Sequence, residues 1–456
     1  MVKKVLIVGG GFTGLTAAYE LSKDPGFSIT LVEGGDQLGG LAGGFSLLGT
    51  SLEKTYHHLF LIDTAILALV EELGLSNSLV WHDSSVGIYR GGRIYPFVTP
   101  FDLLRFTPCS LLGRIRVGLV ALNLKRTRDW RPFVAEPAHQ WMAKACGGSA
   151  MESIWTPLLK GKFDRYYQSV SMAWLWARIH TRANSRKPGQ SREQLGYFHG
   201  GFAVVVQRLE SELRKRGVQI ELNSTVQSFS GTERSAVING RREPFDFCIF
   251  TGPSPAFARL LPVERRAEDS PALPQPGAET ESRLNDYVRQ LQSIEYLGAI
   301  CLVFVSDQNI GEYYWLNVNE PGAPFLVFLN HTRLVDKSHY QGKHVYYIGT
   351  YVPTDHALFG MTDDALNELW WGYLKKMFPE FDRQRVSERH IFRLKAAQHI
   401  VDTAYQSKIP DYRTPLPGVF LANFSQIFPE DRGTNWAVSE GKKVAGMVRE
   451  KAKESA

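Results

Sequence analysis

The chain has 456 residues, of which 44% are hydrophobic and 21% charged, with a formal net charge of +6. This length allows two or three domains, and the composition excludes a disordered or fibrous protein. The mild positive charge is spread along the chain, the four cysteines lie far apart, and no apolar run is long enough for a membrane span. The sequence therefore predicts no nucleic-acid partner, no metal site and no spanning helix.

The chain starts MVKKVLIVGG, without a secretory signal pattern, which predicts a cytoplasmic location. Residues 5–8 predict a short buried strand, and Gly9, Gly11 and Gly14 follow in G-x-G-x-x-G spacing. Such glycines allow a tight turn, the approach of a pyrophosphate and close packing of the next helix. Phe12 and Thr13 lie inside this turn. All five residues are predicted to contact a dinucleotide, whose phosphates would face the amides of the helix start.

A second strand is predicted at residues 29–32, and Glu33 and Gly34 follow it. An acid about twenty residues past the glycine turn accepts hydrogen bonds from a ribose. About six residues later come Gly39, Gly40 and Leu41. An acid followed by such a glycine pair resembles the FAD signature of flavoproteins with two dinucleotide-binding domains. The predicted cofactor is therefore FAD, and these five residues are predicted to contact it.

The whole chain resembles the amine oxidase superfamily in the broad sense, which includes protoporphyrinogen oxidases, phytoene and squalene desaturases and, more distantly, UDP-galactopyranose mutases. The resemblance implies the α/β class, with a Rossmann-like FAD-binding domain assembled from residues 1–60, 196–256 and 411–456. The insertions at 61–195, expected to be mainly helical, and 257–410 would form an α+β substrate domain.

The resemblance also implies further cofactor contacts. The backbone at Val226 would contact the adenine, and the turn at Gly433, Thr434, Asn435 and Trp436 would start a helix that points at the flavin ring. The family commonly has Gly-Asp where this chain has Ala422-Asn423. Asn423 can hydrogen-bond near the phosphate and ribose but carries no charge.

Two histidines are candidate catalytic residues. His58, in the stretch His58-Leu59-Phe60, matches a His-hydrophobic-Phe element that lies beside the flavin in desaturases and galactopyranose mutases. A histidine there can tune the flavin or move a proton, although a structural role remains the alternative. His399 stands where the family usually has a proline, and is expected to face the substrate.

Two stretches of the substrate domain have two interpretations each. In residues 101–131, Leu111, Leu112, Ile115, Leu119 and Leu122 follow helical spacing among arginines and lysines. This pattern fits a helix packed on the core, or a helix that touches a membrane surface and admits an apolar substrate. Residues 155–182 mix aromatic and basic side chains. They fit core packing, or a pocket wall with Lys160, Lys162 and Arg178 on a phosphate.

The predicted function is an FAD-dependent oxidoreductase that transfers a hydride from a largely apolar small molecule to the flavin. Isoprenoids, tetrapyrroles and lipid-linked molecules all fit this class. The first alternative is a galactopyranose-mutase-like enzyme with no net redox change, acting on a nucleotide sugar. The second is a binding protein that keeps the fold without catalysis. Nothing in the pattern predicts an oligomeric state.

Overall fold

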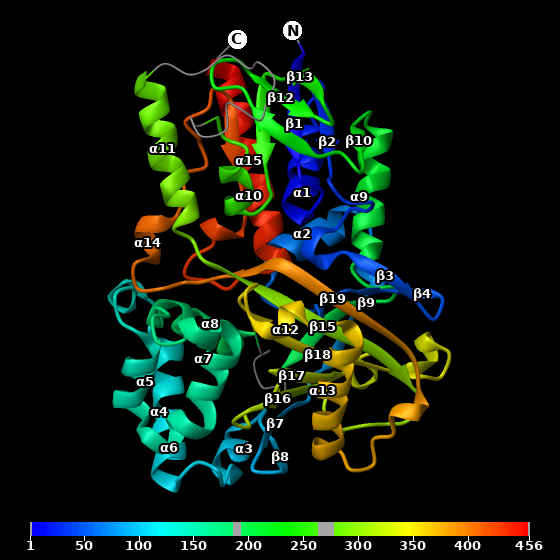
Figure 1. The fold of residues 1–456 in the computed structure, drawn as a ribbon, viewed down its shortest axis with the longest axis vertical. Helices are drawn as coiled ribbons and strands as arrows, with labels where there is room; N and C mark the ends of the chain where they lie inside the picture. The colour runs from blue at the N-terminus through cyan, green and yellow to red at the C-terminus, as the bar shows by residue number, and fades with distance from the viewer. Residues whose placement is uncertain (1, 186–192, 263–277, 455–456) are drawn as a thin grey trace.

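The computed structural model describes residues 2–185, 193–262 and 278–454. Figure 1 shows an upper region with both chain ends and a lower region, with the long strands β15 and β19 passing between them. The upper region contains a five-stranded parallel sheet in the order β10-β2-β1-β14-β20. Its strands are β1 (Lys3–Val8), β2 (Phe27–Val32), β10 (Gln219–Glu221), β14 (Phe247–Phe250) and β20 (Val419–Leu421). Three distant stretches of sequence therefore meet in one sheet.

Helices cover one face of this sheet. Alternate residues of β1 point to opposite faces, so they pack in two different cores. Val5 and Ile7 pack in the same core as the helices α1 (Phe12–Leu21), α9 (Ala203–Lys215) and α15 (Thr434–Glu454). On α15, a Cβ atom at Gly441 would lie 2.6 Å from the Thr13 carbonyl oxygen. The missing side chain thus lets α15 lie directly against α1.

The opposite face of the sheet, which includes Leu6, packs on a three-stranded antiparallel sheet and on two helices. These elements are β11 (Val226–Phe229), β12 (Ser235–Ile238), β13 (Arg241–Pro244), α10 (Ser254–Ala258) and α11 (Ala278–Gln292). The upper region also holds α2 (Thr64–Glu72), which lies against α15. Here the structure differs from the predicted boundaries, which assigned α2 and α11 to the substrate domain. Both helices have apolar faces that the upper cores bury.

The lower region is built on a seven-stranded sheet in the order β19-β15-β18-β17-β16-β7-β8, antiparallel except for the pair β16 and β7. Its strands are β7 (Val86–Arg90), β8 (Arg93–Pro96), β15 (Tyr296–Ser306), β16 (Trp315–Val318), β17 (Val327–Asn330), β18 (His344–Val352) and β19 (Val386–His399). The helices α12 (Ala357–Gly360) and α13 (Asp363–Met377) share a core with one face of this sheet.

Smaller strands link the regions. They are the hairpin β3 (Gly44–Leu47) and β4 (Thr50–Glu53), and the sheet of β5 (Leu59–Phe60), β9 (Gln194–Phe198) and β6 (Leu79–Asp83).

A cluster of helices stands beside the seven-stranded sheet (Figure 1). It contains α3 (Pro100–Arg105), α4 (Leu111–Arg126), α5 (Ala138–Cys146), α6 (Gly148–Ala150), α7 (Thr156–Phe163) and α8 (Met172–Asn184). All six helices lie between residues 100 and 184. Within the described ranges, no helix has both the length and the apolar character needed to cross a bilayer. The predicted α/β class is confirmed.

Candidate functional site

Two glycine turns meet at the start of α1. The Gly39 amide donates to the Gly10 carbonyl at 2.9 Å, and Gly11 and Gly39 form an isolated parallel bridge. A Cβ atom at Gly40 would come within 3.0 Å of the Gly11 Cα atom, so the turns touch where neither has a side chain. Gly11 precedes the helix without a side-chain cap, which leaves the first amides of α1 free for an anion. This cradle fits the diphosphate of a dinucleotide.

The other predicted residues of this turn have clear places. At Gly14, a Cβ atom would lie 1.9 Å from the Gly9 carbonyl oxygen, so only glycine allows the turn. Phe12 and Thr13 are buried in the first turn of α1.

Glu33 ends β2 with its carboxylate held in place. Oε2 accepts from the Gly10 amide at 2.7 Å and Oε1 from the Gly35 amide at 2.8 Å. The neighbouring Gly34 is exposed. The Ser224 amide donates to the Glu33 carbonyl at 2.8 Å, which brings the chain leading to β11 beside the end of β2. The structure thus brings Val226, buried at the start of β11, near the two predicted glycine turns.

The side chain of Asn423 is fully used by the protein. It donates to the Gly252 carbonyl at 2.8 Å and to the Ser254 hydroxyl at 3.2 Å. It also accepts from the Ser425 amide at 2.9 Å and from the Ser425 hydroxyl. With every donor and acceptor engaged, Asn423 links the end of β20 to the loop after β14.

A cavity of about 1100 Å³ extends from the second glycine turn into the helix cluster. The predicted residues Leu41, His58, Gly433, Thr434, Asn435 and Trp436 all line it. Its far part is lined by apolar side chains of α4, α7 and α8, among them Val117, Leu158 and Ile179. A volume slightly above the usual range for ligand sites leaves room for a large substrate beside a cofactor ring.

Asn435 joins two helix starts at the edge of the cavity. Its Oδ1 atom accepts from the Ala65 amide at 2.9 Å and the Ile66 amide at 3.3 Å, in the first turn of α2. This side chain therefore caps α2, and the first residues of α15, Thr434, Asn435 and Trp436, line the cavity.

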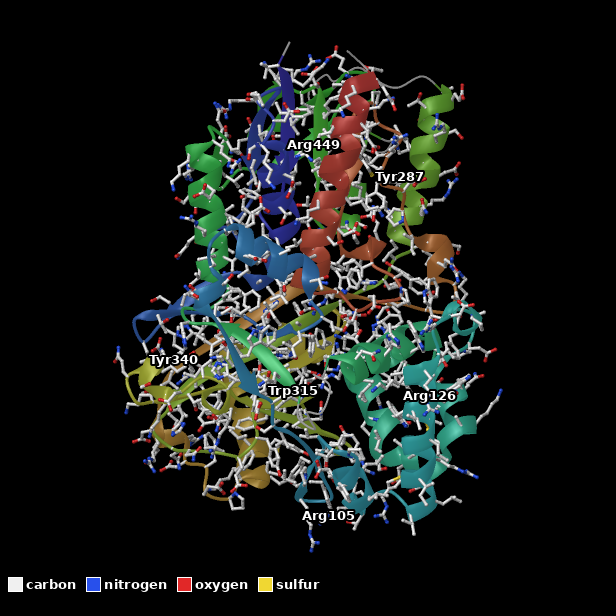
Figure 2. All side chains as sticks on the ribbon, turned by 180° about the vertical axis from the view of Figure 1, so that it is seen from behind. Arg105, Arg126, Tyr287, Trp315, Tyr340 and Arg449 are labelled. Atoms are coloured by element: carbon white, nitrogen blue, oxygen red, sulfur yellow. The ribbon has the colours of Figure 1, made fainter. Side chains whose placement is uncertain are left out.

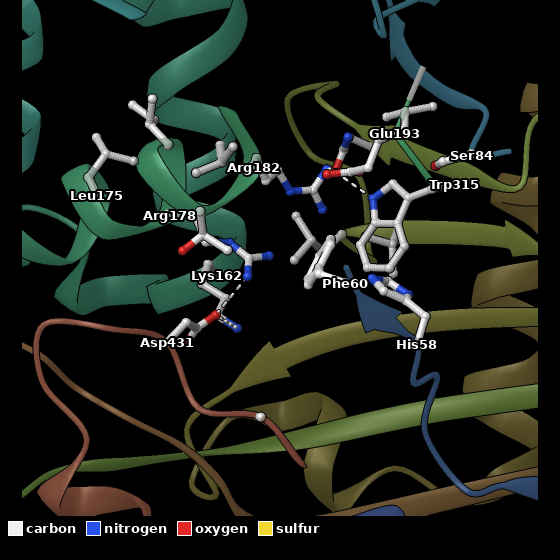
Figure 3. Close-up of a pocket in the computed structure, with 18 of the residues that line it drawn as sticks. His58, Phe60, Ser84, Lys162, Leu175, Arg178, Arg182, Glu193, Trp315 and Asp431 are labelled. Atoms are coloured by element: carbon white, nitrogen blue, oxygen red, sulfur yellow. Dashed lines mark hydrogen bonds and ion pairs between the residues drawn. The ribbon is translucent and has the colours of Figure 1, made fainter. Parts of the chain in front are cut away.

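A buried ion cluster lies in the same wall, at the loop before α15 (Figure 3). The Asp431 carboxylate lies 3.0 Å from the Arg178 guanidinium and 3.5 Å from the Lys162 ammonium, and Trp174 donates to it at 3.4 Å. Burial alone would raise the pKa of Asp431, but the positive charges of Lys162, Arg178 and Arg432 together hold it well below its usual range. Asp431 is therefore ionised and neutralises part of the basic wall.

His58 lies in the cavity wall, with Phe60 and Trp315 edge-on to its ring (Figure 3). Its Nδ1 atom is 3.1 Å from the Tyr314 hydroxyl. Burial lowers the pKa of His58 to about 3, and the nearby Arg182 and Arg178 add to the effect. The imidazole is therefore neutral near pH 7.

His399 does not reach the cavity. It is fully buried and packs beside the rings of Tyr405 and Phe424, whereas Leu394 and Ala397 of the same strand line the cavity. The register of β19 against β15 shifts between Leu394 and His399, so regular alternation does not continue to the strand end. The expectation that His399 faces the substrate is not met by this placement.

The comparisons with known proteins agree with this geometry. A model of the family described as flavin containing amine oxidoreductase matches residues 12–446. The chain belongs to this family. Membership confirms the predicted FAD cofactor and the resemblance noted above.

Among curated proteins, the chain is 23% identical to a coproporphyrinogen III oxidase of Staphylococcus aureus over 291 residues. That match covers 56% of this chain and 62% of the relative, so the chain spans less than two thirds of it. A provisionally assigned protoporphyrinogen oxidase from Exiguobacterium sp. 255-15 has a TM-score of 0.73 at 19% identity, covering 99% of each chain. Reduced UDP-galactopyranose mutase has a TM-score of 0.74 at 13% identity, covering 98% of this chain and 94% of that one. These likenesses establish the flavoprotein fold.

The sequence analysis did not predict four residues that line the cavity. They are Tyr56, Tyr351, Asp431 and Arg432. Asp431 and Arg432 could have been found, because they directly precede the predicted turn at Gly433. Tyr56 and Tyr351 carry no local signal, since aromatic residues in a strand or loop are common core residues.

Proposed function

We propose that this protein is an FAD-dependent oxidoreductase that dehydrogenates a largely apolar small molecule. One observation carries the proposal: a single cavity joins the second glycine turn and the start of α15 to an apolar chamber between α4, α7 and α8. The FAD-binding domain would comprise residues 1–60, 196–256 and 411–456, together with α2 and α11. The sheet that unites strands from these stretches supports this division.

When bound, FAD supplies a two-electron oxidant. The chain would hold it with the glycine turns and Glu33, and the amides at the start of α15 would favour negative charge beside them. The apolar wall would exclude water from the reacting bond. The names of the relatives make a porphyrinogen the first substrate class to test.

The nucleotide-sugar alternative is less well supported. A diphosphate needs uncompensated cations, and Asp431 compensates only one of the two charges of Lys162 and Arg178. Lys160 is exposed and is not among the residues lining the cavity. A galactopyranose mutase is similar in fold at 13% identity, whereas the curated relative matched by sequence is named a coproporphyrinogen III oxidase, which favours the first proposal.

The first experiment is mass spectrometry of small molecules released when the freshly purified protein is denatured, followed by anaerobic mixing of the intact protein with coproporphyrinogen or protoporphyrinogen. FAD in the released fraction and loss of flavin absorbance on mixing would support the proposal. A released nucleotide sugar, and activity only after prior reduction of the flavin, would support the mutase alternative. Absence of any flavin would support a binding protein.

We also propose that the outer face of α3 and α4 touches an anionic membrane surface. Leu111, Leu112, Ile115, Leu119 and Leu122 of α4 are 45 to 62% exposed, and Leu122 also lines the cavity. Arg105, the last residue of α3, and Arg126, the last residue of α4, are exposed (Figure 2). Exposed leucines flanked by arginines suit an interfacial helix, and an apolar substrate could pass from the bilayer into the cavity.

Flotation with vesicles containing phosphatidylglycerol tests this contact. Leu112→Glu together with Leu119→Glu should reduce vesicle binding and leave flavin content unchanged, because neither side chain lines the cavity. Leu369→Glu on α13 is the control, since Leu369 is also exposed but lies on another face. Equal flotation of all three proteins would refute the contact.

A further inference from the structure

Tyr351 lies in the cavity wall among cations that come from two other parts of the fold. It is on β18, and its hydroxyl accepts a hydrogen bond from the Arg432 guanidinium at 3.0 Å. The Lys162 ammonium of α7 lies 4.5 Å from the centre of its ring. The phenol of Tyr56, from the segment between β4 and β5, is close enough to that of Tyr351 for each to shift the pKa of the other. Tyr56, Lys162, Tyr351 and Arg432 all line the cavity.

The charges around this phenol favour its ionised form. Burial raises the pKa of Tyr351, but Lys162 and Arg432 lower it by more, with Asp431 opposing them, so the net direction is downward. The pKa of Tyr56 moves the other way, chiefly through burial and the charge of Tyr351. Cys301 of β15, which also faces Tyr56, has a raised pKa because it is buried. Neighbouring phenols with pKa values pushed apart form a pair in which one accepts a proton and the other stays protonated.

Other titratable groups also line the cavity. Asp63, Glu193 and Glu430 each already accept a hydrogen bond, from the Phe60 amide, the Ser185 hydroxyl and the Thr181 hydroxyl. His58 is less suited to this role. The pKa of His58, about 3, makes its imidazole a weak proton acceptor. Lys162 is held by Asp431 and stands over the phenol, so its charge supports the ionisation of Tyr351.

We propose that Tyr351, as a phenolate, takes the proton that the substrate loses during oxidation, with Lys162 and Arg432 holding its charge. This inference rests on the proposed function and names the residue that completes it. The substrate loses a C–H bond, whose two electrons leave as hydride to the bound FAD. It also loses an N–H or C–H proton, which forms the O–H bond of Tyr351. A new C=N or C=C bond remains in the product.

The test that does not depend on turnover is a near-ultraviolet pH titration of tyrosine ionisation in the flavin-loaded protein. Wild type should show one phenolate that forms below the usual range, and Tyr351→Phe should lose that single step. Lys162→Met should move the step to higher pH. Tyr373→Phe is the matched control: Tyr373 of α13 lies outside the cavity lining, its hydroxyl has no hydrogen-bond partner among the described residues, and burial raises its pKa to about 12.

Anaerobic flavin reduction by a porphyrinogen then separates this proposal from the preceding one. Tyr351→Phe should keep its FAD, but the porphyrinogen should reduce this FAD at least about 100-fold more slowly than in wild type. The rate should also lose the part of its pH profile that rises with pH. If wild type shows no low-pH tyrosine step, or Tyr351→Phe retains it, the inference about Tyr351 is wrong whatever the substrate. If the step is present and depends on Tyr351, but no porphyrinogen reduces the flavin, the substrate class is wrong and the ionised Tyr351 stands.

Discussion

The glycine cradle at the start of α1 and the ion cluster at the start of α15 are built in opposite ways. The cradle is formed by residues 9–41, which are close together in sequence. It depends on backbone contacts between glycines, whose missing side chains allow the two turns to touch. The cluster brings Lys162 and Arg178, on the consecutive helices α7 and α8, to Asp431 near the end of the chain, with Tyr351 of β18 beside Lys162. It acts through side-chain charge. A site made from spacing can be recognised in a sequence, whereas a site made from crossing elements needs the fold. The following changes test each part of this comparison.

The largest effect is expected from Gly11→Val in the cradle. Its Cβ atom would point toward Gly40, whose Cα atom would lie 3.8 Å away, and the branched side chain would fill the gap between the turns. We expect loss of bound FAD because the diphosphate can no longer approach the backbone. Flavin absorbance of the purified protein measures this. Gly446→Ala on α15, where a Cβ atom meets nothing within 4 Å, is the control, and normal FAD in Gly11→Val would refute the cradle.

Asp431→Asn should damage the ion cluster and leave the cradle intact. Removing one partner of a buried ion pair leaves buried charge uncompensated, which costs about 3 kcal/mol of unfolding free energy. Denaturant unfolding monitored by circular dichroism measures the loss. Asp129→Asn, in an exposed pair with Arg131, is the control and should change stability little. Equal stability of the two variants would mean that the cluster is not held as the geometry indicates.

The pH dependence of stability tests the contacts of Glu53, which lies where the two regions join. It accepts from the Tyr197 hydroxyl at 2.7 Å and the Phe202 amide at 2.5 Å, and burial raises its pKa from 4.5 to about 7. Between about pH 4.5 and 7, Glu53 is therefore protonated in the folded state but ionised in the unfolded state. Its contribution to the unfolding free energy is present at low pH and lost as pH rises. Over that window it amounts to about 3 kcal/mol.

In Glu53→Gln the side-chain amide stays neutral, so the unfolding free energy of this variant should depend less on pH than that of wild type. The measurement is the difference in unfolding free energy between wild type and Glu53→Gln at several pH values from 5 to about 7.5. We expect the variant to gain on wild type as pH rises. A constant difference would show that Glu53 does not titrate in this range.

The smallest effect is expected from His58→Ala. The change removes the contact with the Tyr314 hydroxyl from the cavity wall but touches neither glycine turn. FAD content should be unchanged, and flavin reduction should slow by about fivefold, the effect of one lost hydrogen bond. Because the pKa of His58 is about 3, the pH profile above 5 should keep its shape. No change in rate or flavin potential would assign His58 a structural role.

The sequence by itself determined the nucleotide-binding end of the molecule. Strand, glycine turn, helix, acid and glycine pair occur in order within 41 residues, and each constrains backbone conformation, so spacing alone predicts their meeting. The α/β class and FAD followed from this pattern and from the family resemblance.

Only the tertiary structure decided what the side chains do. Asn423 and Asn435 looked alike as polar cofactor contacts, but one ties β20 to a loop and the other caps α2. His399 and Tyr351 both lie near strand ends, yet a register shift buries the first and cations surround the second. Charge compensation and burial depend on which distant elements pack together. Residue spacing does not show which side chains hundreds of positions apart will lie together, and so it does not show which charges compensate each other.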